Sequence, residues 1–252
     1  DEEEGAYEGT PFFQDLGNIL PYPIGGGKWM PFAIFFGTAF VLSSVLCFDF
    51  LIGLPVNIIG WVLLYGYLSS LMRQSMEQPQ EPPPDWNFGA LPQILIEGAK
   101  VFAVLAVFSL TPVAILLILT IMFFLNSMAM WGYVTMVLTV VVFLGLLFVV
   151  PAGLAVLASS GNLGRAMNPL NFIGIVGGGG TPYLMLASFS AAAGLACMGV
   201  TIAGVFLAEV PIAGFVVAGL LMGAVFAYAN FIWFHVVGRF AAENKGLTAR
   251  FA

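Results

Sequence analysis

"EPPPDWNFGALPQILIEGAK", residues 81–100, is a polar interruption between two long apolar stretches. Residues 82–84 are three prolines, which cannot continue a helix, so the preceding helix ends before them. Trp86, with Phe88 close by, suits the headgroup layer of a membrane, where an amphipathic ring lies partly in lipid. Pro92 can occupy the first turn of the next helix, because its missing N–H would lack a partner there anyway. The pattern predicts a surface segment between two membrane helices.

The sequence on either side is too apolar for a soluble domain. Hydrophobic residues make up 60% of the chain and charged residues 8%, whereas soluble domains carry about 25% charged residues. Residues 101–164 contain no Asp, Glu, Lys or Arg, and residues 166–238 contain only Glu209. One helical crossing needs about 20 apolar residues. Long apolar runs with internal Gly and Pro indicate membrane helices, because strands of a membrane barrel alternate apolar and polar residues.

The basic residues divide the chain into three hairpins. Two crossings fit between Lys28 and Arg73, two between Lys100 and Arg165, and two more before Arg239. An even number of crossings places all the Lys and Arg residues with both termini on one side, and positive charge concentrates on the cytoplasmic side. We therefore expect an all-α membrane protein with both termini cytoplasmic. Its six transmembrane helices form three hairpins, at about 29–50, 55–73, 98–125, 128–158, 181–208 and 211–238.

Shorter segments flank this six-helix domain of residues 29–240. Residues 1–28 form an acidic, Pro/Gly-rich N-terminal tail that carries much of the net charge of −6, and residues 241–252 form a short C-terminal tail. Residues 162–176 are too short to span and are interrupted by Pro169, so they are expected along the cytoplasmic surface. No basic patch is present, so no nucleic-acid partner is expected.

The linker and its two flanking helices resemble a prokaryotic membrane family known as domain of unknown function 4013. The resemblance is carried by "GYLSSLMRQSMEQPQEPPPDWNFGALPQILIEGAKVF" and by the closing element "FHVVGRFA". The matching residues are Gly66, Tyr67, Arg73, Pro84, Asp85, Trp86, Gly98, Lys100, Gly238 and Arg239. The resemblance implies a six-helix integral membrane protein of the prokaryotic cytoplasmic (inner) membrane. It implies no activity.

Three ionisable residues lie in or near the predicted hydrocarbon region: Asp49, Glu209 and His235. Such residues are functional candidates, but both acids fall at predicted turns, where water can reach them. His235 could ligate the metal of a haem or chlorophyll, and a packed or interfacial histidine is the other interpretation. We predict no cofactor and no metal site, because a metal site needs several converging His, Cys or carboxylate ligands.

Two regions are candidate contact surfaces. Asp85, Trp86 and Phe88 in the linker either anchor the chain at the headgroups or hold a partner. Gly219 and Gly223 lie on one helix face, where small residues let helices approach closely. Such a face serves either the contact between the helices expected at 181–208 and 211–238 or another subunit.

These observations favour a non-enzymatic membrane protein, an accessory or scaffold subunit of a larger membrane complex. Its partners would be lipid and other membrane subunits. The alternative is a transporter or channel for a small neutral or lipidic solute, since Pro112, Pro151 and Pro182 could break helices near a site. A membrane enzyme is disfavoured by the lack of paired catalytic groups.

Overall fold

The computed structural model describes residues 11–27, 29–48, 50–208 and 213–251, and all regular structure within them is helical. The longer helices are α2 (Met30–Phe48), α3 (Phe50–Glu77), α4 (Leu91–Leu105), α5 (Thr111–Leu125), α6 (Ala129–Ser160), α8 (Pro169–Gly178), α9 (Gly180–Ala208) and α10 (Ala213–Glu243). The shorter ones are η1 (Phe12–Gln14), α1 (Leu16–Ile19), η2 (Tyr22–Gly27), η3 (Phe88–Ala90), the π-helix η4 (Ala106–Leu110), α7 (Leu163–Ala166) and α11 (Lys245–Phe251).

Five helices are long and apolar enough to cross a membrane. They cover Pro55–Glu77, Leu91–Ser109, Ala129–Ser160, Gly180–Gly204 and Val216–Glu243. Three further apolar helical stretches of the described chain are shorter: Met30–Leu42 in α2, Thr111–Leu125 and Pro169–Gly178. The chain is therefore an all-helical, multi-pass membrane protein.

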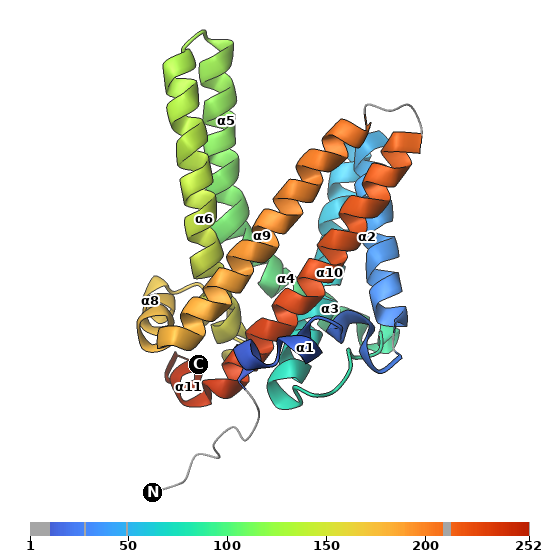
Figure 1. Cartoon of the computed structure of the whole chain (residues 1–252), viewed down its shortest axis with the longest axis vertical. Helices are drawn as coiled ribbons and strands as arrows, with labels where there is room; N and C mark the ends of the chain where they lie inside the picture. Colours follow the sequence, from blue (N-terminus) through green and yellow to red (C-terminus); the bar gives the residue numbers. More distant parts are fainter. Residues whose placement is uncertain (1–10, 28, 49, 209–212, 252) are drawn as a thin grey trace, which may run out of the picture.

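The helices form two groups that diverge from a common base (Figure 1). The α5–α6 hairpin is one group, which we call the arm. The second group contains α2, α3, α9 and α10, with α10 packed against α2, α3, α6 and α9. The short helices α1, α8 and α11 lie at the base. This arrangement leaves α5 with its main contacts to α6 and η4 alone.

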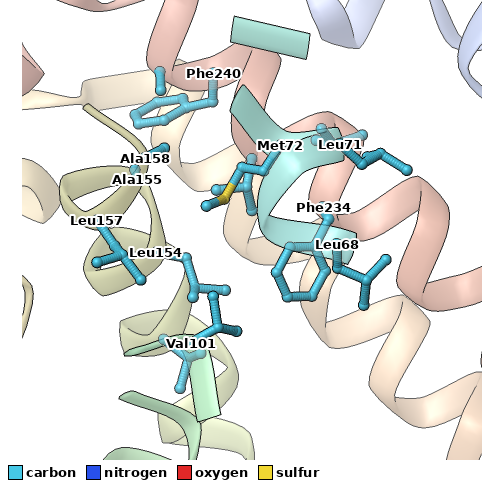
Figure 2. Close-up of a cluster of buried hydrophobic side chains, with 14 of the residues drawn as sticks. Leu68, Leu71, Met72, Val101, Leu154, Ala155, Leu157, Ala158, Phe234 and Phe240 are labelled. Carbon is cyan, nitrogen blue, oxygen red and sulfur yellow. The ribbon is translucent and has the colours of Figure 1, made fainter. Parts of the chain in front are cut away.

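A buried apolar cluster joins the two groups at the base (Figure 2). It brings together side chains from α3, α4, α6 and α10: Leu68, Leu71, Met72, Val101, Leu154, Ala155, Leu157, Ala158, Phe234 and Phe240. Lipid tails are as apolar as these side chains, so helix association here depends on close van der Waals packing more than on exclusion of water. The base is therefore the packed core of the molecule.

Two glycines allow α3 and α4 to cross closely. A β-carbon on Gly98 would collide with the carbonyl oxygen of Val62 and lie 2.7 Å from the backbone nitrogen of Gly66. A β-carbon on Gly66 would collide with the carbonyl oxygen of Ile94. Backbone atoms cannot rotate away, so any larger residue here must push the two helices apart.

Several boundaries differ from those expected. The turn expected before Pro55 is largely helical, because α3 begins at Phe50 and contains that proline. The helix expected at 98–125 begins at Leu91, with Pro92 in its first turn. It is then interrupted by η4, where the Thr111 N–H donates to the Ala106 carbonyl five residues earlier. Pro112 accounts for this irregularity, because proline has no N–H to donate and its ring crowds the preceding turn.

The described part of the N-terminal segment also differs from a free tail. Residues 11–27 lie across the base, and Phe12, Ile19 and Tyr22 are buried there. At the other end, α10 continues to Glu243 and α11 packs against α6 and α8. Both segments carry apolar side chains that pack against the base. The acidic composition of residues 1–28 and the short length of residues 241–252 did not indicate this packing.

Candidate functional site

Trp86 fastens the linker to two helices. Its ring stacks on Tyr67 of α3, with ring centres 4.4 Å apart and planes 9° from parallel. Its indole Nε1–H donates to the carbonyl oxygen of Pro31 in α2, at 3.2 Å. The Tyr67 hydroxyl donates to the Pro84 carbonyl at 3.0 Å. Trp86 is therefore committed to contacts within the chain, while its neighbour Asp85 is exposed.

The other linker candidate, Phe88, lies in η3, and its side chain is outside the described residues. The anchoring and partner-holding interpretations of the linker both remain hypotheses.

An ionic network holds α3, α4 and the end of α6 together. Glu97 accepts hydrogen bonds from Arg73 at 2.7 Å and from Lys100 at 2.9 Å. Lys100 Nζ also donates to the carbonyl of Gly161, 2.9 Å away, where α6 ends in a left-handed turn. These side chains are partly exposed, and such pairs contribute about 1 kcal/mol or less each. Their value lies in fixing the geometry of the base.

His235 belongs to a buried polar cluster that the sequence did not reveal. Its Nδ1 lies 2.8 Å from Ser75 Oγ, which is also 2.8 Å from the Leu71 carbonyl oxygen. Its ring stacks on Tyr22, with ring centres 3.6 Å apart. A metal would therefore have to use the other imidazole nitrogen, so haem or chlorophyll ligation remains an untested alternative.

The Ser75–His235 pair has the spacing of a nucleophile and its base. However, Ser75 is 1% exposed and does not line the neighbouring hollow. The buried position fits a structural hydrogen bond between α3 and α10.

A second buried contact ties the N-terminal segment to α10. Arg239 Nη1 donates to Asp15 Oδ2 at 2.6 Å, and the Arg239 side chain is 1% exposed. The backbone N–H of Phe12 donates to Glu243 Oε1 at 2.6 Å, and the Tyr228 hydroxyl donates to the Leu20 carbonyl. These contacts hold residues 11–27, which we call the strap, against the base.

A hollow of about 250 Å³ lies between the strap, the linker and α10. Its walls include Tyr22, Glu81, His235 and Arg239. Burial raises the pKa of Tyr22 to about 12, although the hydroxyl of Ser75 opposes the shift. The Tyr22 phenol is therefore neutral at physiological pH.

The glycines expected to face another helix lie inside the chain. β-Carbons on Gly219 and Gly223 would each come within 3.0 Å of a ring carbon of α2, in Phe40 and Phe36 respectively. These glycines therefore serve the α2–α10 contact. The acids Asp49 and Glu209 lie outside the described residues.

The arm carries many exposed apolar side chains on its two neighbouring helices. Thr120 and Thr135 join α5 to α6 through a 3.0 Å hydrogen bond between hydroxyls. The remaining faces are strongly exposed. Their exposed side chains include Ile115, Leu117, Ile118, Ile121, Met122, Leu125, Met130, Trp131, Tyr133, Met136, Val137, Val140 and Val141.

The helical content and the apolar spans define an all-helical, multi-pass integral membrane protein. Within that class, the chain belongs to the family described as a protein of unknown function (DUF4013), whose model matches residues 50–206. The match covers α3 to α9, including the linker with Trp86, and the closing element around Arg239 lies beyond it. No curated protein and no solved structure matches the chain.

Proposed function

We propose that this protein is a non-enzymatic subunit of a prokaryotic membrane complex and that the arm is the surface through which it holds another membrane protein. The observation that carries the proposal is the isolation of the arm. Its helices pack against each other, and α6 also packs against α9, α10 and the base, yet most apolar side chains of residues 114–141 are exposed.

The proposed orientation has six crossings, with both termini on the cytoplasmic side. The crossings are α2, α3, the continuous run from α4 to α5, α6, α9 and α10. The basic residues support this orientation, because those described lie near the base ends of α3 and α10, on the short helices α7 and α11, or, for Lys100 of α4, in contact with Gly161 at the base end of α6. They are Arg73, Lys100, Arg165, Arg239, Lys245 and Arg250. Cytoplasmic segments carry the excess of Lys and Arg.

The chemistry of the arm suits a protein partner. Helices in lipid associate through shape and packing, and a separate two-helix hairpin has both outer sides available for such packing. Met122, Met130 and Met136 add flexible, polarizable side chains that can adapt to a partner's surface. The arm contains no charged residue, so the partner's complementary surface is expected to be apolar as well.

The test is co-purification from the native membrane with matched variants. The arm variant changes three exposed residues to Ala: Ile118, Val137 and Val141. The control changes three exposed residues of the other group to Ala: Ile202, Val217 and Leu221. We expect one stoichiometric partner with the wild type and the control, and its loss from the arm variant. A monomer without a partner, or equal retention by both variants, would contradict the proposal.

The second candidate is a transporter for a small neutral or lipidic solute. One observation favours it, a cavity of about 320 Å³ between α6, α9 and α10. A transporter also needs a route across the membrane, which solute flux into proteoliposomes would test. A lack of flux with every neutral solute tried would remove this candidate.

A further inference from the structure

The cavity lies between α6, α9 and α10, and residues of α3, α4 and η4 complete its wall. Apolar side chains of α6 form one wall, with Phe143, Leu147 and Val150. Residues of α9 and α10 form the opposite wall, including Met198 and Phe226. Its volume of about 320 Å³ falls at the lower end of the range for small-molecule sites.

Three polar groups of the cavity wall retain unused hydrogen-bonding capacity. The amide N–H of Asn230 donates to the Phe226 carbonyl at 2.9 Å, but its side-chain oxygen accepts no hydrogen bond from the described residues. The hydroxyls of Tyr65 and Ser109 likewise make none within the described chain. Asn230 is 8% exposed, so its free acceptor is enclosed by protein and cavity. An unpaired polar group in the hydrocarbon layer is costly.

Two neighbouring polar side chains of the cavity wall, Trp233 and Ser190, already have hydrogen-bond partners within the chain. Trp233 Nε1 donates to Ser190 Oγ at 2.8 Å, and Ser190 donates to the Leu186 carbonyl at 2.8 Å. Ser109 reaches the wall from the π-helix η4. Single π-helical turns within α-helices occur frequently at functional sites. The polar groups of the cavity therefore come from four separate helical segments.

Among the described residues, no Asp, Glu, Lys, Arg or His lines the cavity. A charged ligand would leave its charge uncompensated in an apolar site, which strongly disfavours it. A neutral ligand with a hydroxyl group could donate to Asn230 and accept from Tyr65 or Ser109. Its hydrocarbon chain would contact the apolar wall of α6.

From these observations we propose that the cavity binds an uncharged, hydroxyl-bearing lipid of the long-chain alcohol class, with its hydroxyl at Asn230 and its chain between α6 and α9. The bilayer is the source of the ligand, since α9 residues of the cavity such as Met198 and Thr201 are also exposed on the outer surface of the molecule. The inference rests on the cavity alone and holds whether or not the arm binds a subunit.

The test uses the full chain in phosphatidylcholine nanodiscs and two photoreactive probes, a C16 alcohol and the matching C16 fatty acid at pH 8. We expect saturable labelling by the alcohol, competed by hexadecan-1-ol, with adducts on α6, α9 and α10. The ionised fatty acid should bind at least about tenfold more weakly, because the cavity offers its charge no partner.

Matched variants separate cavity binding from general lipid contact. Ala193 lines the cavity, whereas its neighbour Ala192 on α9 is exposed and does not. Ala193→Leu should abolish saturable labelling, and Ala192→Leu should leave it unchanged. Asn230→Leu should lower the affinity for the alcohol probe by about fivefold, the usual effect of losing one hydrogen bond.

Four outcomes would overturn the proposal: no saturable labelling, equal labelling by both probes, wild-type labelling of Ala193→Leu, or adducts spread over all exposed faces. An absence of saturable labelling would mean that water alone satisfies the polar groups. Size-exclusion profiles of the two Leu variants at positions 193 and 230 check folding, and each tests the cavity independently of the other. Loss of the arm's partner leaves the labelling unaffected, so the two proposals fail separately.

Discussion

Replacing Gly98 by Ala tests the close crossing of α3 and α4. The added β-carbon would collide with the Val62 carbonyl oxygen and lie 2.7 Å from the Gly66 nitrogen. Because both are backbone atoms, the helices must separate, and overpacking of this kind costs about 1–3 kcal/mol. The intrinsic helix preference of Ala returns about 0.5–1 kcal/mol. The free energy of unfolding should therefore fall by about 1 kcal/mol.

Gly145→Ala is the matched control, since a β-carbon at this position of α6 meets no atom within 4 Å. It receives the same gain in helix preference without the collision, so the two variants should differ by about 2 kcal/mol. For a chain of this size, that difference corresponds to about 6 °C in Tm. Thermal unfolding in one detergent, followed by circular dichroism, measures it.

Equal Tm values for Gly98→Ala and Gly145→Ala would refute the reasoning, because they would mean that α3 and α4 do not approach at backbone distance. A further check is Gly66→Ala, which affects the same crossing. The variant that carries both Gly66→Ala and Gly98→Ala should lose less stability than the sum of the two single losses. One separation of the helices relieves both collisions.

Three other changes address the base and the topology. Asp15→Asn removes the carboxylate that pairs with buried Arg239 and should destabilise the packing of the strap by about 3 kcal/mol. Proteolytic cleavage within residues 11–27 should become faster, and an unchanged cleavage rate would contradict this role of the strap. Trp86→Ala should lower Tm by several degrees while Trp86→Phe retains much of the stacking, and equal loss by both would assign the effect to the indole N–H alone. In a chain with Cys47 and Cys197 replaced by Ala, Asn126→Cys should react with an impermeant thiol reagent from outside the cell. Ala249→Cys should react only after permeabilisation, and labelling of both from the same side would refute the orientation.

The membrane helices could be predicted from sequence because their signal is local. Residues 101–164 exclude every charge, and Pro92 marks the first turn of α4 through its own chemistry. Pro112 also carried a local signal for a helix break, and the irregular turn η4 directly precedes it, within the single helix expected at 98–125.

The buried polar contacts could not be predicted in the same way. Asp15 and Arg239 are 224 residues apart, and Ser75 and His235 are 160 residues apart. Nothing in the neighbourhood of either partner indicates the other. The acidic composition of residues 1–28 did not indicate that one of its carboxylates, Asp15, pairs with buried Arg239 of α10.

The separation of the arm also leaves no signature in the sequence. Lipid-facing, partner-facing and core-facing positions of a membrane helix are all apolar, so composition does not distinguish them. Gly219 and Gly223 illustrate the limit, since their spacing indicated a close helix contact but not that α2 provides it. The cavity at Asn230 likewise depends on how four helical segments meet.

The most direct test of the central claim places a photoreactive amino acid at Val137 of the arm, 63% exposed, and at Val217 of the other group, 53% exposed. After irradiation of intact native membranes, the account predicts one discrete protein adduct from position 137 and only lipid adducts from position 217. Lipid adducts alone from position 137 would contradict the claim that the arm holds another membrane protein.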